Sequence, residues 1–307
     1  MINPELETSQ ESLDQVPESF TRPLGLWHVQ EQLATGNGVV ALAGAGGDGG
    51  LVAEMLVRAG VREIRVADPE EFGIENTNRQ AFCNSSTVGM NKAEAVAEGL
   101  RLINPNAIVK VYNEGVHEDN VDEFVRGADV VIDETEFTMH WLGVMVARAA
   151  RRHGVYNAMG MNVGFAGTVT GFMPNGPTFE SMLGLSDDMS LQEIKQQEVP
   201  LERWLPYVPE YADLEMLQKV AAGEKSAPTV QIGVGMAASM VTTEAQLALT
   251  MHINNSRREP IQYPQVRYMD AYTGNAGIID DPIASHARGM AAMFEANTHG
   301  QAPRVSY

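Results

Sequence analysis

Apolar runs and amphipathic segments alternate along the first half of the chain. Residues 39–43 form a continuous apolar run that ends in a glycine-rich stretch, residues 44–50. Apolar residues then recur at helical spacing over residues 52–59, and Gly60 follows as a helix C-cap. Residues 63–68 form a second strand-like run that ends in a carboxylate. A strand, a helix and a strand within about thirty residues predict a right-handed βαβ unit.

The same alternation continues to about residue 156. The pattern predicts a helix over residues 92–102, which ends before a proline, and a strand over residues 108–112. A third buried strand is expected at residues 130–133, and a helix with a basic C-terminal end runs from about Met139. These elements predict an α/β protein with a Rossmann-like, doubly wound, mainly parallel sheet.

The second half has a different pattern. Residues 166–173 and 266–279 are typical of hairpin strands, with turns expected at residues 174–177 and 273–275. They predict that antiparallel strands extend the parallel sheet. The weakly polar run over residues 233–250 contains a glutamate and several hydroxyl residues, so a buried helix is expected there and not a membrane span.

Composition narrows the function classes. The chain has 307 residues with 21 Lys and Arg against 40 Asp and Glu, a net charge of −19. This charge argues against nucleic acid or an anionic membrane as the main partner. The single cysteine excludes an intrachain disulfide framework and a four-cysteine zinc site. The N-terminus has neither a basic segment nor an apolar one, so no signal peptide is expected and we predict a cytoplasmic protein.

The glycines between the first strand and the first helix are suited to phosphate binding. Gly44, Gly46 and Gly49 follow the spacing G-x-G-x-x-G, and only glycine lets the main chain approach a phosphate. Asp68 ends the next strand, where a carboxylate can accept hydrogen bonds from ribose hydroxyls. The alternative is a tight strand–helix junction with Asp68 as a cap. At this point the nucleotide can be a dinucleotide or ATP.

Two cations follow this unit. Arg79 lies in the run Asn76-Thr77-Asn78-Arg79-Gln80, and Lys92 follows Gly89-Met90-Asn91. Adenylyl transfer needs positive charge near the α-phosphate and the leaving pyrophosphate, whereas hydride transfer needs little of it. Either residue alone is also explained as a solvated partner in a surface ion pair.

Taken together, these motifs resemble the ThiF/MoeB/HesA superfamily, whose members are adenylyltransferases similar to ubiquitin-activating enzymes. The resemblance runs from about Phe20 to Ile279. It rests on an ordered set of motifs, namely Thr21-Arg22, Gly44 to Gly49, Asp68-Pro69-Glu70, Asn76 to Gln80, Gly89-x-x-Lys92, Asp133-Glu134-Thr135-Glu136, Gly167-Thr168-Val169 and Tyr268-Met269-Asp270-Ala271.

The resemblance implies a role for each matching residue. Asp68 holds the ribose, Asn76 and Lys92 contact the phosphates, and Arg79 with Arg22 reaches the triphosphate, one or both from the partner subunit of a homodimer. Glu136 is a hard oxygen ligand suited to magnesium. The remaining nucleotide-binding positions implied in this way are Gly44, Gly46, Gly47, Gly49, Glu70, Asn78, Gln80 and Asp133.

Several positions depart from the family pattern. Asp48 replaces the usual apolar residue of the glycine loop, either as a carboxylate at a helix start that faces away from the phosphates or as part of a cation site. Glu136-Phe137 stands where the family has aspartate-asparagine. Thr178 and Ser181 occupy the positions of the first zinc-binding cysteine pair, so structural zinc is not expected. Cys83 lacks a cation next to it apart from Arg79, which favours a small buried residue over a thioester nucleophile.

The resemblance also implies a domain organisation. Residues 1–18 form a flexible acidic arm, residues 19–290 a single adenylation domain and residues 291–307 a tail. Within the domain, residues 178–226 are expected to cross over the carboxylate tail of the substrate. The aromatic residues of this crossover either line a channel for an extended peptide or pack the loop against the domain, and they are Trp204, Tyr207 and Tyr211.

The sequence thus predicts an ATP- and magnesium-dependent adenylyltransferase. Its expected acceptor is the C-terminus or a side-chain carboxylate of a small ubiquitin-like sulfur carrier, or of a ribosomally made peptide. Two alternatives stay open. Asp48 and Glu136-Phe137 fit a protein that binds ATP without chemistry, and the glycine loop with Asp68 fits a nicotinamide-dependent oxidoreductase.

Overall fold

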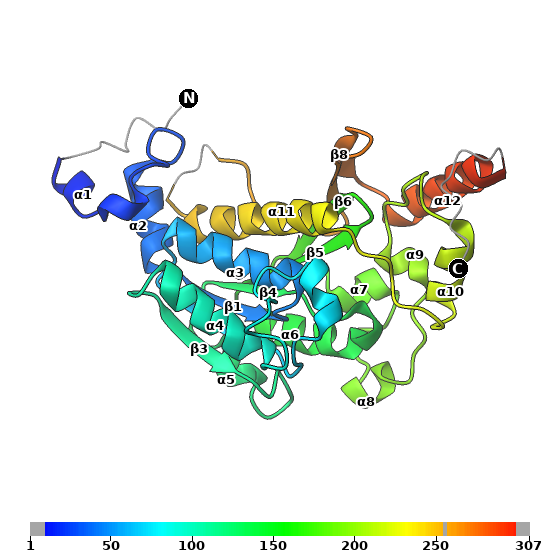
Figure 1. Cartoon of the computed structure of the whole chain (residues 1–307), viewed down its shortest axis with the longest axis horizontal. Helices are drawn as coiled ribbons and strands as arrows, with labels where there is room; N and C mark the ends of the chain where they lie inside the picture. Colours follow the sequence, from blue (N-terminus) through cyan, green and yellow to red (C-terminus); the bar gives the residue numbers. More distant parts are fainter. Residues whose placement is uncertain (1–9, 254–256, 299–307) are drawn as a thin grey trace.

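A computed structural model describes residues 10–253 and 257–298 of the chain (Figure 1). Within these residues one sheet holds eight strands in the order β3-β2-β1-β4-β5-β6-β7-β8. The first five of these positions are parallel, and β6 to β8 add antiparallel strands. This confirms the predicted fold class. The strands are β1 (Val39–Ala43), β2 (Glu63–Ala67), β3 (Ile108–Tyr112), β4 (Val130–Asp133), β5 (Tyr156–Val163), β6 (Ala166–Phe172), β7 (Val266–Asp270) and β8 (Ala276–Ile279).

Helices cover both faces of the sheet. The longer ones are α2 (Val29–Asn37), α3 (Gly47–Ala59), α4 (Lys92–Ile103), α6 (His140–Arg152), α10 (Leu214–Ala221), α11 (Gln231–Thr250) and α12 (Pro282–Thr298). Shorter ones are α1 (Gln10–Asp14), α5 (Val121–Val125), α7 (Phe179–Leu183), α8 (Leu191–Ile194), α9 (Leu201–Trp204) and the 3₁₀ turns η1 (Glu18–Phe20), η2 (Ile74–Asn78) and η3 (Phe137–Met139).

The apolar run of β1 is continuous because both faces of this strand are buried. Val40 and Leu42 pack with α3, α4 and α11 on one side of the sheet. Val39 and Ala41 point the other way, into a core formed with α5 and α6. Successive side chains of a strand face opposite sides, so a central strand between two helical layers has no polar position. Figure 1 shows α3 and α11 side by side along one face.

The strand order places a crevice between β1 and β4. From β1 the chain moves outward to β2 and β3, and it then returns to β4 on the opposite side of β1. In open α/β sheets, ligands bind at such a switch point, outside the carboxyl ends of the strands. The glycine loop after β1 and the acidic segment after β4 both lie at this edge.

One of the two predicted hairpin turns is correct. The turn at residues 273–275 joins β7 to β8 as expected. The turn at residues 174–177 does not form a hairpin, because β6 pairs with the preceding strand β5. After β6 the chain enters α7, and Arg151 donates hydrogen bonds to the carbonyls of Gly176 and Pro177. A Pro- and Gly-rich turn has the same composition whether it leads to a strand or to a helix.

The structure describes only part of the two expected end segments. Residues 1–9 and 299–307 lie outside the described residues. Helix α12 runs through the expected boundary at residue 290, and Met293 is fully buried in a cluster with Leu205 and Val208. The expected tail therefore begins inside a helix that packs against the domain.

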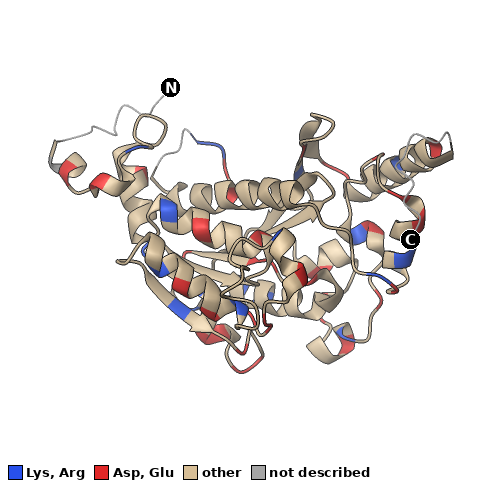
Figure 2. Cartoon of the chain, in the orientation of Figure 1, with Lys and Arg blue, Asp and Glu red and all other residues tan. Residues whose placement is uncertain are grey.

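Helix α11 is the buried helix that the sequence predicts. Only one of its twenty residues is charged, and Figure 2 shows its ribbon almost without blue or red. That residue, Glu244, is fully buried and forms hydrogen bonds with the guanidinium of Arg258 and the amide of Ile261. No helix in the described part of the chain is both long and apolar enough to span a bilayer.

Candidate nucleotide site

The glycine loop leaves no space for side chains at its two ends. Gly44 has φ +95°, and a Cβ on it would lie 2.2 Å from the carbonyl oxygen of Glu134. A Cβ on Gly49 would lie 2.0 Å from the carbonyl oxygen of Gly44. Gly46 and Gly47 open α3 with bare main chain, and the nearest atom to a Cβ would be 3.8 Å away at Gly46 but 3.3 Å away, in the side chain of Val234, at Gly47. The bare main chain at the helix start is the arrangement that phosphate binding requires.

Asp68 holds the glycine loop from the end of β2. Its Oδ2 accepts a hydrogen bond of 2.8 Å from the amide of Ala45, and its Oδ1 accepts one of 2.9 Å from the amide of Glu70. Burial raises the pKa of Asp68, and the two amides oppose that shift. The capping role considered from the sequence is therefore present. Each carboxylate oxygen keeps a second lone pair that a ribose hydroxyl can use.

Lys92 opens α4 beside this carboxylate. Its side chain is 7% exposed and forms an ion pair with Glu70, whose side chain is 58% exposed. The charge of Lys92 also acts on Asp68 and opposes the rise in its pKa that burial causes. Because Glu70 extends into solvent, it can move away from Lys92 when a phosphate takes its place.

Arg79 lies on the other side of the glycine loop, directly after η2. Its Nη1 donates to the carbonyl of Glu75 at 3.1 Å and to Oδ1 of Asn78 at 2.9 Å. Its carbonyl oxygen is 3.9 Å from the position of a Cβ on Gly47. Among the described residues no carboxylate forms an ion pair with Arg79.

Two amide side chains complete this side of the loop. The Oδ1 of Asn76 accepts from the amide of Gly73 at 3.0 Å, so a phosphate contact would have to come from its Nδ2. Gln80 is 6% exposed, and its Nε2 is the atom that lies 3.8 Å from a Cβ on Gly46. Its Oε1 is buried and lacks a hydrogen-bond partner in the described structure. A ligand donor would satisfy that oxygen.

The acidic segment after β4 forms the opposite wall. Asp133 is buried, and its Oδ1 accepts from the amide of Thr135 at 3.1 Å and from its hydroxyl at 2.7 Å. Burial raises the pKa of Asp133. Glu136 is exposed and lines, with Asp133, Phe137 and His140, a pocket of about 290 Å³. Asp133 thus shapes the turn, whereas Glu136 has a carboxylate free for a cation.

A magnesium ion would need ligands beyond these side chains. In residues 10–253 and 257–298 no group of three or more His, Cys, Asp or Glu is arranged to hold a metal. Magnesium is commonly bound by one or two carboxylates together with substrate phosphates and water. Glu136 fits the first part of that ligand set.

Arg22 does not lie at this site. It is exposed and follows Phe20, whose ring packs on Gly60 at the C-terminal end of α3. The glycine loop is at the other end of that 13-residue helix, about 20 Å away. Within one chain the structure therefore does not bring Arg22 together with Arg79 and Lys92.

A pair of buried carboxylates lies under the loop, and the sequence singled out only one of them. Asp48 is in the first turn of α3, as expected, but it points inward, and Nδ2 of Asn162 in β5 donates to both its oxygens at 2.9 and 3.1 Å. Burial raises the pKa of Asp48 to about 7. Burial and the charges of Asp48 and Asp133 raise the pKa of Glu134 well above its usual range.

Asp48→Asn should stabilise the protein more at neutral pH than at acidic pH. The fold raises the pKa of Asp48 from 3.8 to about 7, so the native state favours the protonated carboxyl. Its contribution to stability is complete below pH 3.8 and is lost as the pH rises through about 7. Asparagine does not ionise and avoids this loss. The measurement is urea unfolding of both proteins at several pH values, and Asp119→Asn, on a side chain 99% exposed, is the control. Parallel stability curves for wild type and Asp48→Asn would contradict the burial of this carboxyl.

Other expectations concern Cys83 and the missing cysteine pair. Cys83 is 5% exposed, and its thiol donates to the carbonyl of Gly73 at 3.4 Å, which confirms a small buried residue. Thr178 caps α7 by accepting a hydrogen bond from the amide of Ser181. In the crossover segment, the hydroxyl of Tyr207 donates a hydrogen bond to Asp270, and the hydroxyl of Tyr211 accepts one from the amide of Phe165. These two aromatic residues therefore pack the crossover segment against the domain.

Comparison with known proteins gives sequence matches over part of the chain and a structural match over most of it. A tRNA threonylcarbamoyladenosine dehydratase of Escherichia coli is 39% identical over 95 residues, 31% of this chain and 35% of that protein. A SAMP-activating enzyme E1 of Haloferax volcanii is 32% identical over 144 residues, 47% of this chain and 52% of that protein. The chain thus spans about a third to a half of these curated relatives.

The fold of E. coli MccB, solved with ATP, covers 91% of this chain and 73% of its own with a TM-score of 0.65 at 15% identity. Residues 20–282 match the ThiF family. This range contains most of the chain and all of the site described above. This protein belongs to the ThiF family.

Proposed function

We propose that this protein transfers the adenylyl group of ATP to a carboxylate, giving an acyl-adenylate and pyrophosphate. The observation that carries the proposal is the charge of Arg79, which lies beside the glycine loop without a carboxylate partner among the described residues. The charge of Arg79 acts on the buried Asp48 but forms no ion pair with it, and in a chain of net charge −19 such a cation favours an anionic ligand. Hydride transfer gives it no role.

Each residue of the site has a separate role in the proposed reaction. The main chain at Gly46 and Gly47 binds phosphate oxygens at the start of α3, and Asp68 holds the ribose. A carboxylate oxygen of the acceptor attacks the α-phosphorus, and the bond to the β-phosphate bridging oxygen breaks. Arg79, and Lys92 once released from Glu70, stabilise the negative charge that moves onto pyrophosphate. Magnesium held by Glu136 would neutralise phosphate charge.

The acceptor in this proposal is the carboxylate of a ubiquitin-like sulfur carrier or of a ribosomally made peptide. The name of the Haloferax relative, a SAMP-activating enzyme E1, supports activation of a protein. A tRNA acceptor, as in the name of the E. coli relative, fits less well because the net charge of −19 opposes RNA binding. Residues 178–226 contribute Trp204 to the pocket beside Glu136, which supports their role as the substrate segment.

We also propose a homodimer in which Arg22 serves the site of the partner subunit. The distance of Arg22 from its own glycine loop supports this arrangement. Mixing Arg22→Ala protein with Arg79→Ala protein should restore part of the activity, because some mixed dimers keep one complete site. Mixtures that stay as inactive as the parents would contradict shared sites.

ATP with magnesium should raise the melting temperature of the protein, and NAD should not. A ligand that binds only the native state adds about 2.7 kcal/mol of stability at a hundred times its dissociation constant. The measurement is thermal unfolding with each nucleotide. Stabilisation by NAD alone would contradict adenylyl transfer and favour the oxidoreductase. If ATP binds but no carboxylate supports pyrophosphate release, the ATP-binding pseudo-enzyme is favoured instead.

A further inference from the structure

A second pocket adjoins the one at the end of β4. It encloses about 350 Å³, including its opening to solvent, and its walls are mainly methionine, proline and aromatic side chains. The two pockets share Met159, Gly160, Met161 and Trp204. A molecule bound against Asp133 and Glu136 therefore borders directly on this second pocket.

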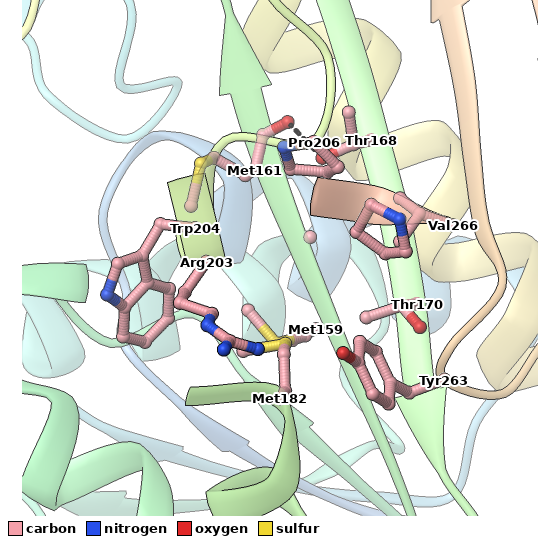
Figure 3. Close-up of a pocket in the computed structure, with 12 residues that line it drawn as sticks. Met159, Met161, Thr168, Thr170, Met182, Arg203, Trp204, Pro206, Tyr263 and Val266 are labelled. Atoms are coloured by element: carbon pink, nitrogen blue, oxygen red, sulfur yellow. Dashed lines mark hydrogen bonds between the residues drawn. The ribbon is translucent and has the colours of Figure 1, made fainter. Parts of the chain in front are cut away.

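Arg203 brings a positive charge into this apolar pocket. Figure 3 shows its guanidinium pointing into the space beside Trp204, Met159 and Met182, and the hydroxyl of Tyr263 faces it from the opposite wall. The guanidinium lies against the main chain at Gly184, where a Cβ would be 2.9 Å from Nη2.

Neither polar group has a protein partner within the described part of the chain, and both stay open to solvent, because neither is among the buried atoms that lack a partner. Arg203 has no hydrogen bond or ion pair there, and the hydroxyl of Tyr263 has no hydrogen bond. Arg203 also does not stack on a ring, unlike Arg257, which lies 4.7 Å from the ring centre of Trp27. Burial raises the pKa of Tyr263, the charge of Arg203 opposes this rise, and that of Asp281 adds to it. Asp281 is exposed, and its Oδ1 accepts a hydrogen bond from the amide of Ala284.

The guanidinium of Arg203 and the hydroxyl of Tyr263 are suited to bind a carboxylate. A guanidinium presents a planar set of donors that matches the two oxygens of a carboxylate, and a tyrosine hydroxyl can add a third donor. Arg203 is half-buried among these apolar side chains, so its guanidinium is partly dehydrated and gains more from an anionic ligand than a fully exposed arginine would. The methionine and aromatic walls suit an apolar stem.

We propose that this pocket binds a second carboxylate of the acceptor through Arg203 and Tyr263, while the first carboxylate of the acceptor lies at the nucleotide. The inference rests on the proposed adenylyl transfer for the nature of the bound molecule. It makes the acceptor a dicarboxylic group with a short apolar stem, such as an acidic residue with both carboxylates free. Arg203 then determines specificity and takes no part in the transfer.

Binding of glutarate, with pentanoate as its monocarboxylate counterpart, tests this pocket without any chemistry. Both acids are titrated into the full-length protein with a non-hydrolysable ATP analogue present, and saturation-transfer NMR measures their binding. Wild type should bind glutarate more tightly than pentanoate. Arg203→Met, which keeps an unbranched apolar stem but removes the guanidinium, should lose at least about tenfold in glutarate affinity, as expected for a hydrogen-bonded charge pair. Arg126→Met, which removes an exposed charge, is the matched control.

Each result separates this inference from the proposed function. Loss of glutarate binding in Arg203→Met at unchanged ATP affinity and melting temperature supports the pocket, even if no acceptor is ever adenylated. Equal binding of glutarate and pentanoate by wild type would overturn it. Weaker ATP binding in Arg203→Met would assign Arg203 to the phosphates and would also overturn it, while adenylyl transfer would stand.

Discussion

Arg79→Ala should lower ATP–pyrophosphate exchange by at least about a hundredfold. The charge of Arg79 acts on Asp48 in the first turn of α3, and its guanidinium is bonded only to the carbonyl of Glu75 and the amide oxygen of Asn78 among the described residues. In the proposed reaction its removal takes away charge that stabilises the departing pyrophosphate, and it breaks no ion pair among the described residues. The fold should therefore stay intact. Exchange of labelled pyrophosphate into ATP measures the loss, and thermal unfolding measures the stability.

Two variants make this result specific. Arg58→Ala removes an arginine from the exposed side of α3, where it pairs with Glu54, and should leave exchange unchanged. Arg79→Lys keeps the charge without the planar set of donors and should retain part of the activity. Near-normal exchange by Arg79→Ala would show that the cation at the reacting phosphates lies elsewhere.

Gly49→Ala should destabilise the protein by about 3 kcal/mol and abolish ATP binding. Its Cβ would lie 2.0 Å from the carbonyl oxygen of Gly44, so the main chain of the loop would have to shift. Because both residues belong to the glycine loop, the shift moves the amides at the start of α3, which bind phosphate in the proposed function. Urea unfolding without nucleotide measures the first effect, and ATP titration measures the second.

Gly235→Ala is the matched control. Gly235 lies in α11, and a Cβ on it would meet nothing within 4 Å. The same substitution there should stabilise the helix by about 0.5–1 kcal/mol, because alanine loses less backbone entropy than glycine. If Gly49→Ala and Gly235→Ala had similar stability, the tight closure of the glycine loop against Gly44 would be wrong.

The parallel half of the fold could be predicted because its signals are local. The run from Val39 to Ala43 is apolar throughout since helices cover both faces, and Gly60 ends α3 with φ +97° as a C-cap should. The turn at residues 174–177 was mispredicted because its composition does not reveal the next element. The packing of α12 was missed because Met293 contacts residues about ninety positions earlier, which no local pattern indicates.

Only the part of the site that local sequence signals determine could be predicted. Asp68, Lys92 and the glycines lie near one another, as strand ends and helix starts of one sheet must. The direction of a side chain beyond a strand end cannot be derived from spacing. Asp48 therefore could not be placed against Asn162, nor Glu134 beside it, and the pocket position of Arg203 was not anticipated. The roles of these residues in binding stay predictions.

Exchange of labelled pyrophosphate into ATP, with magnesium and a panel of peptides and small proteins with free C-terminal carboxylates, tests the central claim most directly. Adenylyl transfer predicts exchange that depends on one acceptor and disappears in Arg79→Ala. ATP binding without exchange for any acceptor in the panel, including dicarboxylic ones, would contradict it.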